Sequence, residues 1–398
     1  MARSGRRKAP QPGRTVARVI VASLLSLGVL TGLGVVLVYN HWNSNVDQVP
    51  IGDQVKNRPA AKTKAINILV MGSDTRDGKG NGVDGESGGG LSDTTMLFHL
   101  SADRKFAYGI SIPRDSAVMR PTCYRDDGSE IAATTGYVKW NEAYAAGGPF
   151  CTIQQFEQLT DIRIDNYLLV DFNQFKDMVD ALDGVEICLP QDIDDEERNV
   201  HLKAGTRVVD GEEALAYVRV RYGISGGIDP NRTRRQQAFI GSMISRALTA
   251  GILTRPDKLV SFMNAATSSL QTNFKNIGQM ADLGLDARKV GADNIKFVTT
   301  PWIYSDKVSS GVEWTEAVDR LWALVRNDEP LSAEFRKDAL SASDEPDGAS
   351  TDPSPDVSES GTPDGSSTGT TDEATDPAAP GGSDGLSTSG REAAGLCT

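Results

Sequence analysis

The stretch AINILVMGSD, at residues 65–74, determines how the core of this chain begins. It is a short apolar run that ends in Gly-Ser-Asp, which is the pattern of a buried strand leading into a loop. Two neighbouring runs, TTMLFHL at 94–100 and FAYGISI at 106–112, have the same character. The sequence therefore predicts three consecutive short strands joined by polar loops.

Strands and helices alternate further along the chain. YLLVDF at 167–172 and VEICL at 185–189 predict strands on either side of a helix at 173–182. The other expected elements are a segment that begins as a helix at 212–221, helices at 233–248, 256–270 and 314–325, and a strand at 294–299. This alternation predicts an α/β fold with helices on both faces of a sheet, an α/β/α domain over residues 60–328.

The N-terminal segment has the pattern of a membrane anchor. Residues 19–39 contain no charge, and as a helix they would span roughly 31 Å, the thickness of a bilayer's hydrocarbon core. The first 20 residues hold six basic side chains and no acid, which predicts that 1–18 is cytoplasmic. A cleaved signal peptide is the alternative, but the apolar run is long and VLVYNHW offers no small-residue cleavage site. Residues 40–59 are then a juxtamembrane linker, and the rest of the chain is extracytoplasmic.

The C-terminal segment, 329–398, is predicted to be a disordered tail. From residue 341 onward it has twelve acids, one base and no aromatic side chain, and it is rich in Ser, Thr, Pro and Gly. Such a composition cannot bury enough apolar surface to offset its ordering entropy. The whole chain carries a net charge of −13, which argues against nucleic acid as its partner.

The four cysteines fit an exported protein and no common zinc site, because neither C-x-x-C nor H-x-x-x-H occurs. Cys123 and Cys151 flank a polar, turn-rich segment, and an oxidising exterior would permit a disulfide between them. Four cysteines allow three pairings, so this bridge is a hypothesis. Cys188, in the strand-like VEICL, is interpreted as a buried free thiol, and Cys397 ends the predicted tail.

Two carboxylates stand at the ends of the first two predicted strands. Asp74 follows the first strand and Asp93 precedes the second, so both can reach one edge of a sheet, where α/β proteins commonly bind ligands. Two carboxylates with waters and phosphate oxygens suit Mg²⁺. The alternative is that each is a turn or cap residue. The loop between them has seven glycines from 78 to 90 but lacks the Lys-Ser/Thr of a phosphate loop, so it is a lid or an insertion.

The arginines indicate an anion site. Arg114 follows the third strand, and five arginines with no lysine and a single acid, Asp229, lie between 219 and 235. Guanidinium groups bind phosphate oxygens in bidentate fashion and keep their charge, so a pyrophosphate or polyanionic ligand fits. The alternative is a solvated charged face. His99, in an apolar strand, is interpreted as a hydrogen-bonded core residue, which leaves Ser-His catalysis without support.

Six strings occur in order between residues 72 and 237: GSDTR, SDTTMLFHL, SIPRD, VKWNEAYAAGG, DGEEALAYVRVRY and NRTRRQQ. Behind a single signal anchor, they resemble the LytR-CpsA-Psr family of bacterial cell-envelope proteins. The resemblance implies a three-layer α/β/α sandwich with a central mixed sheet that holds a polyisoprenyl-linked lipid in an apolar tunnel. It also implies transfer of an anionic glycopolymer, teichoic-acid-like or arabinogalactan-like, from an undecaprenyl-pyrophosphate carrier to peptidoglycan outside the membrane.

The resemblance also assigns roles at the site. Asp74 and Asp93 match acids near Mg²⁺, with Mn²⁺ as an alternative ion, and Asp93 is the closer ligand; Asp74 is a candidate base. Arg76, Arg114, Arg219 and Arg221 match arginines at the pyrophosphate, and Arg232 and Gln236 match the pattern that closes the site. Arg235 joins the expected binding residues because it shares a helical stripe with Arg232. The Cys123/Cys151 pair resembles actinobacterial members. The Gly-rich loop and Asp-Pro-Asn before Arg232 depart from the family pattern, and the acidic tail replaces an accessory domain.

Two other functions remain open from the sequence. A pyrophosphatase would use the same site with water as the acceptor. A non-catalytic envelope regulator would bind lipid carriers without cleaving them. An extracytoplasmic domain without a DNA-binding motif makes direct control of transcription a poor interpretation.

Overall fold

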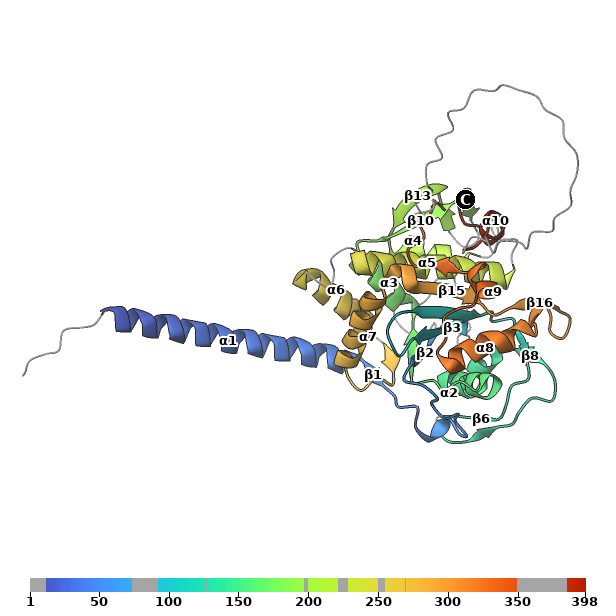
Figure 1. Cartoon of the computed structure of the whole chain (residues 1–398), viewed down its shortest axis with the longest axis horizontal. Helices are drawn as coiled ribbons and strands as arrows, with labels where there is room; N and C mark the ends of the chain where they lie inside the picture. The colour runs from blue at the N-terminus through green and yellow to red at the C-terminus, as the bar shows by residue number, and fades with distance from the viewer. Residues whose placement is uncertain are drawn as a thin grey trace, which may run out of the picture.

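A computed structural model describes residues 12–73, 92–125, 127–196, 200–220, 228–249, 255–268, 270–348 and 385–398. Figure 1 shows a layered domain with a long N-terminal helix, α1 (Pro12–Asn45), that projects from one side. A sheet lies between two helical layers, which confirms the predicted α/β/α sandwich.

The central sheet has eight strands and is mixed. In spatial order they are β1 (Asp47–Gln48), β14 (Gln271–Thr272), β9 (Asn166–Val170), β2 (Ile66–Ser73), β3 (Ser92–Leu100), β4 (Ala107–Ile112), β15 (Ile295–Thr299) and β18 (Leu340–Ser341). β3 is antiparallel to β2 and β4, whereas β2 is parallel to β9 and β4 to β15. The carboxyl ends of β9, β2, β4 and β15 therefore lie at the same end of the sheet as the amino end of β3.

Alternation along the strands builds the two cores. In β4, Tyr108 and Ile110 face a core that includes helices α2 (Glu142–Thr160) and α8 (Ala317–Asn327). Gly109 faces the other layer, where a Cβ would lie 2.7 Å from a ring carbon of Phe297. That layer contains α5 (Asp229–Thr249) and α7 (Ile277–Val290). Figure 1 shows α5 on one side of the sheet and α2 and α8 on the other.

A second apolar cluster packs against α5. It consists of α3 (Phe172–Ala181), α4 (Gly211–Arg219) and the hairpin of β10 (Val185–Leu189) with β13 (Gly205–Val209). VEICL thus forms the predicted strand, but in this hairpin outside the central sheet. The remaining helices of the described residues are α6 (Pro256–Thr267), α9 (Ala333–Arg336) and α10 (Thr388–Ala394).

The strands predicted from the sequence are present within a few residues, as are the helices, but α2 and α7 were not predicted. α2 runs through what the sequence suggests is a turn-rich segment. Gly147 and Gly148 have non-helical dihedrals and Pro149 follows them, so the helix is kinked at its Gly-Gly-Pro. The Gly-Gly-Pro pattern therefore does interrupt the helix, but the helix continues after it.

Helix α1 (Pro12–Asn45) contains the predicted anchor, residues 19–39. By length and composition it can cross a membrane, and none of its apolar window is buried in the domain. Its C-terminal end contacts α6, where Trp42 Nε1 donates to Asn264 Oδ1 at 2.6 Å. Such a helix fits a membrane anchor attached to one side of the domain.

The predicted linker, 40–59, is wrong as a free segment. Ile51 and Val55 are each 4% exposed and belong to the main core. Arg58 pairs with the buried Glu157 at 2.5 Å, and β1 extends the sheet by pairing with β14. The domain therefore begins immediately after α1.

The predicted disorder of 329–398 is also wrong for the residues that the structure describes there. Leu331, Phe335 and Leu340 are buried, and β18 pairs with β15. At the chain end, Leu396 is 3% exposed. Composition averaged over the tail conceals this short apolar ending, and residues 349–384 lie outside the described part of the chain.

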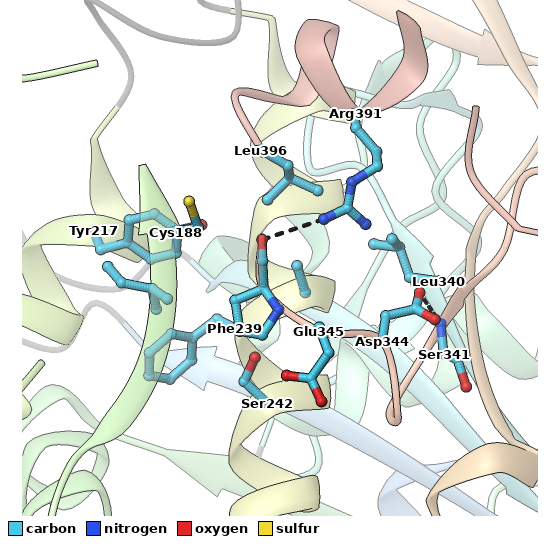
Figure 2. Close-up of a pocket in the computed structure, with 13 residues that line it drawn as sticks. Cys188, Tyr217, Phe239, Ser242, Leu340, Ser341, Asp344, Glu345, Arg391 and Leu396 are labelled. Carbon is cyan, nitrogen blue, oxygen red and sulfur yellow. Dashed lines mark hydrogen bonds between the residues drawn. The ribbon is translucent and has the colours of Figure 1, made fainter. Parts of the chain in front are cut away.

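Cys188 is not a free thiol, because it forms a disulfide with Cys397. The bridge holds the C-terminal segment, 385–398, against the domain. Figure 2 shows Arg391 and Leu396 of this segment around a small pocket that Tyr217 and Phe239 also line. The Arg391 guanidinium donates to the carbonyl oxygens of Cys397 at 2.7 Å and Pro346 at 3.2 Å. The predicted Cys123–Cys151 disulfide is confirmed.

His99 is the core histidine that the sequence predicts. Its ring is 1% exposed and lies 2.8 Å from Asn67 Oδ1 and 3.1 Å from Asp328 Oδ1. It stacks on Tyr108 at a centroid distance of 4.8 Å. Burial lowers the pKa of His99 from its ordinary value, and the opposing effect of Asp328 is smaller.

We expect this burial to make stability fall on acidification. The unfolded chain takes up a proton at His99 near pH 6.5, whereas the folded state takes it up only at lower pH. Stability therefore rises with pH through the window below 6.5, by at most about 1.4 kcal/mol per pH unit. His99→Gln should flatten this slope in thermal unfolding followed by circular dichroism. An unchanged slope in His99→Gln would contradict the assignment.

Candidate active site at the strand ends

Among the described residues, Arg114, Arg232 and Gln236 lie at the end of the sheet described above, as does the backbone of Asp93. Ser73, the last residue of β2, pairs with Ser92 of β3, so position 93 stands at the edge. Arg114 follows β4 by two residues. Asp74, Arg76 and Arg221 lie outside the described residues, as does the side chain of Asp93, whose backbone is the second residue of β3.

A buried carboxylate joins two of the predicted arginines. Asp229 Oδ1 accepts a hydrogen bond from Arg232 Nη2 at 2.6 Å and lies 3.3 Å from Arg114 Nε. Its Oδ2 accepts from the backbone N–H of Arg114 at 2.8 Å. The side chains of Asp229 and Arg232 are 6% and 5% exposed, and that of Arg114 is 16% exposed. The carboxylate therefore fixes both guanidinium groups against the end of β4.

The local sequence explains this geometry. Asp229 lies in the first turn of α5, where a negative charge is favoured by the helix dipole. Arg232 follows one turn later, and a spacing of three residues places both side chains on one face of the helix. Thr233 Oγ1 also donates to the Asp229 carbonyl oxygen at 3.0 Å, which fixes the start of α5.

A second ion pair borders Arg114. Lys139 Nζ lies 2.8 Å from Asp115 Oδ1, and Arg114 Nε lies 3.8 Å from Asp115 Oδ2. Among the described residues, Asp115 and Asp229 thus hold the three cations Arg114, Lys139 and Arg232 close together at the end of β4. Guanidinium groups fixed in this way are suited to binding the oxygen atoms of an anionic ligand.

Gln236 and Arg219 connect the second apolar cluster to the site. Gln236 Oε1 accepts from Thr94 Oγ1 at 3.2 Å, and its Nε2 donates to the Val218 carbonyl at 3.1 Å. It thereby ties the start of β3 to the end of α4. Arg219, in the last turn of α4, stacks over the ring of Phe172 at 4.4 Å. Both side chains thus hold α4 beside the strand ends.

Two aromatic side chains from the VKWNEAY segment support the strand ends. Trp140 Nε1 donates to Thr95 Oγ1 at 3.2 Å, and Tyr144 Oη donates to Ser73 Oγ at 3.2 Å. Both are buried. They fix the end of β2 and the start of β3, which lead to positions 74 and 93, the two positions that the sequence assigns to the metal.

Arg235 does not belong to this site, and its predicted role in substrate binding does not fit the structure. Its side chain is fully buried, and its guanidinium donates to the carbonyl oxygens of Tyr217, at 3.2 Å, and Val220. Burial lowers the pKa of Arg235 to about 10. Arg235 therefore binds the end of α4 to α5, and Arg232, three residues earlier, faces the site.

We expect Arg235→Ala to lower the free energy of unfolding by about 3 kcal/mol or more. The change leaves a cavity and strands two carbonyl groups without their donor. Arg219→Ala, at a partly exposed position, should reduce stability by less than about 1 kcal/mol. Urea or thermal unfolding of both variants makes the comparison. A wild-type melting curve for Arg235→Ala together with lost ligand binding would show that Arg235 is a ligand residue after all.

Sequence reasoning missed Asp115, Lys139, Tyr144 and the bridging role of Asp229. The first three occur in the SIPRD and VKWNEAY strings. Asp115 could have been found from the sequence, because it is adjacent to Arg114 at a strand end. Asp229 was visible as the single acid among the arginines. An acid in such a run is the natural partner of a buried guanidinium.

Comparison with known proteins agrees with this architecture. TagV of Bacillus subtilis, named a polyisoprenyl-teichoic acid–peptidoglycan teichoic acid transferase, is 30% identical over 66% of this chain and 65% of its own length. The probable cell wall biosynthesis protein LcpB of Corynebacterium glutamicum is 33% identical over 61% of this chain. The chain spans only 56% of the length of LcpB.

Solved structures show the same fold. The crystal structure of B. subtilis TagV aligns with a TM-score of 0.51 and 26% identity over 68% of this chain and 99% of that one. A LytR-Csp2A-Psr enzyme from Actinomyces oris aligns with a TM-score of 0.54 and 18% identity over 75% of this chain and 99% of that one, which supports the fold alone. The model of the LytR_cpsA_psr family matches residues 36–323. The chain therefore belongs to the LytR_cpsA_psr family, and its type fits the actinobacterial members.

Proposed function

We propose that this chain is a membrane-anchored phosphotransferase that moves an anionic wall glycopolymer from an undecaprenyl-pyrophosphate carrier to peptidoglycan. The observation that carries the proposal is the pair Arg114 and Arg232, fixed on buried Asp229 at the strand ends. Relatives in the family are named teichoic acid transferases, which supports a teichoic-acid-like polymer, with an arabinogalactan-like polymer as the alternative.

The arginines supply electrostatic stabilisation. Cleavage of a pyrophosphate link accumulates charge on the phosphoryl oxygens, and guanidinium groups fixed in advance stabilise it without a covalent nucleophile. An acceptor sugar hydroxyl attacks the sugar-linked phosphorus, a new P–O bond forms, and the bond to the bridging oxygen breaks. Polyisoprenyl phosphate leaves, and the hydroxyl proton passes to a base, for which Asp74 is the candidate.

Mg²⁺, or Mn²⁺, is part of the proposal. Mg²⁺ uses one or two carboxylates with waters and substrate phosphates, so it needs no cluster of protein ligands. Among the described residues no group of three or more His, Cys, Asp or Glu forms such a cluster. The side chains of Ser73, Ser92 and Thr94 place hydroxyl oxygens at the strand ends beside positions 74 and 93, and oxygen is the ligand atom that suits this ion. Asp93 and Asp74 would hold it, and it would neutralise pyrophosphate charge.

The anchor supports the assignment of the compartment. Six basic residues precede the apolar part of α1, so the N-terminus is cytoplasmic and the domain is extracytoplasmic in this proposal. The two disulfides fit an oxidising exterior. There the domain would meet both the lipid carrier and peptidoglycan.

The test uses the full chain in detergent with Mg²⁺ and an undecaprenyl-pyrophosphate-linked saccharide. Mass spectrometry follows the release of undecaprenyl phosphate with and without peptidoglycan. Release that requires peptidoglycan supports the transferase. Equal release without the acceptor would replace it with a pyrophosphatase, and lipid binding without release would replace it with a carrier-binding regulator.

A further inference from the structure

Helix α1 is joined to the domain without a free linker. Trp42 Nε1 donates to Asn264 Oδ1 of α6 at 2.6 Å, and the Ile277 N–H of α7 donates to Asn43 Oδ1 at 3.4 Å. Immediately after α1, β1 pairs with β14 in the central sheet. The last turn of α1 is therefore held by α6 and α7, so the domain has one orientation relative to its anchor.

The contact between α1 and α6 lies at the depth of lipid headgroups. The charge-free span ends at Tyr39, and Trp42 follows three residues later, which is about 4.5 Å along a helix. The headgroup region on each side of a bilayer is about 6 Å thick. When residues 19–39 span the hydrocarbon core, Trp42 therefore lies in the headgroup region, and so does Asn264, which is bonded to it.

The exposure of α1 shows that the domain shields the end of the span as well. Val38 and Tyr39 precede Trp42 by four and three residues, so they share its face of the helix. Their side chains are 38% and 40% exposed, whereas Leu37, on another face, is 61% exposed. The helices that contact α1 are α6 and α7. These two helices therefore reach the level at which the apolar span ends.

Helix α6 presents one continuous exposed stripe. Among its described side chains, the exposed ones are Asp257, Val260, Ser261 and Asn264, at the helical spacing i, i+3, i+4 and i+7. We call these four residues the α6 stripe. The opposite face packs on the second apolar cluster through Phe262. Because Asn264 bonds to the anchor, the stripe lies on the anchor side of α6, and Figure 1 shows α6 on the side of the domain from which α1 projects.

The chemistry of the α6 stripe suits lipid headgroups, because it combines an aliphatic side chain with a hydroxyl, an amide and a carboxylate. Its charges are balanced: Arg255, immediately before α6, pairs with Asp257 at 3.1 Å, and Lys258 pairs with Asp183. A balanced surface lacks the polybasic attraction that selects anionic lipids. Contact with the bilayer should therefore depend on the anchor and not on the charge of the lipid.

We propose that the α6 stripe lies on the headgroups of the outer leaflet, and that α1 and α6 together hold the domain in one orientation on the bilayer. This surface is linked to the candidate site. α6 packs on α3, where Gln174 Nε2 donates to the Ala266 carbonyl at 2.7 Å, and α3 begins at Phe172, whose ring lies 4.4 Å from the guanidinium of Arg219. The inference rests on the proposed membrane anchoring and adds to it the surface that touches lipid.

The test measures quenching of a nitrobenzoxadiazole label in the full chain, reconstituted into phosphatidylcholine vesicles that carry a nitroxide on the lipid headgroup. All four cysteines form disulfides, so one introduced cysteine is the single labelling site. Val260→Cys reports on the α6 stripe, and Tyr39→Cys, at the end of the span, is the positive control. Ile303→Cys is the matched control, because Ile303 is an exposed aliphatic residue on β16 (Trp302–Ser305), which Figure 1 shows on the side opposite α1.

Quenching at position 260 should reach at least about half of that at position 39, because both positions would lie in one headgroup region about 6 Å thick. Quenching at position 303 should be several-fold weaker, since that position lies across the domain from the bilayer. Raising the salt concentration should leave quenching at position 260 unchanged, because the charges beside the α6 stripe are paired.

Three results would overturn the inference. Quenching at position 39 without quenching at position 260 would place the anchor in the membrane and α6 away from it. Equal quenching at positions 260 and 303 would mean that the domain has no fixed orientation. Absence of quenching at position 39 would remove the proposed anchoring together with the inference. The transfer assay is separate: a chain that releases no carrier while position 260 is quenched as expected loses the transferase proposal and keeps the membrane contact.

Discussion

Arg114→Ala should reduce peptidoglycan-dependent release of the lipid carrier by roughly 10²-fold or more, the size of effect seen when one preorganised electrostatic group is removed from an active site. The substitution removes a guanidinium that lies 3.3 Å from Asp229 in a largely buried setting. The reaction is followed by mass spectrometry of undecaprenyl phosphate, with the full chain and Mg²⁺.

The fold should survive this change, so the loss can be assigned to chemistry. Asp229 keeps its bond to Arg232, and it keeps the backbone N–H at position 114, which alanine also supplies. Arg320→Ala provides the control, because Arg320 is a 60% exposed arginine paired with Glu334 on the surface. Arg114→Lys, which retains the charge but loses the planar fork, should fall between the two. If the Arg114→Ala variant melts like the wild type and releases the carrier at the wild-type rate, Arg114 does not have the proposed role in the reaction.

The sequence predicts the site where the signal is local. Arg114 follows an apolar run by two residues, so its place at a strand end could be inferred from the alternation of 106–112. His99 could be assigned to the core for the same reason, because it stands between apolar neighbours in a strand. In each case the strand pattern and the polar residue lie within a few positions of each other.

The rest depends on how distant segments pack, and no local pattern contains that information. Arg232 and Arg235 are both charged and lie one helical turn apart, yet one faces the site and the other is buried against Tyr217. The difference arises because α4 packs on α5 at that point. Asp229 likewise joins β4 through a contact that spans 115 residues of sequence.

The C-terminal segment shows the same limit on a larger scale. Its composition is that of a disordered tail, but the buried residues near its end and one cysteine are enough to attach it. Cys397 reaches back 209 residues to Cys188, beside the pocket that Tyr217 and Phe239 line (Figure 2). The segment therefore packs on α5, the helix that carries Arg232.

Cys397→Ser should lower the free energy of unfolding by up to about 5 kcal/mol, because the bridge closes a very long loop and so removes much entropy from the unfolded chain. For a domain of this size the melting temperature should fall by roughly 10 °C or more. Opening the Cys123–Cys151 bridge, whose sequence separation is 28, should cost less, about 3.5 kcal/mol in the same chain-entropy model. Thermal unfolding of the two single variants, Cys397→Ser and Cys151→Ser, measures the order directly.

The order of the two stability losses shows whether the Cys188–Cys397 bridge stabilises the domain more than the Cys123–Cys151 bridge does. If the C-terminal segment stabilises the domain, Cys397→Ser should be the less stable variant, and a reducing agent should bring the wild type down at least to its level. Replacing Arg391 by alanine, with the disulfide intact, removes the bonds to Cys397 and Pro346 and should cost only about 1–2 kcal/mol. A Cys397→Ser variant that melts like the wild type would mean that packing of Leu396 and α10 alone holds the segment in place.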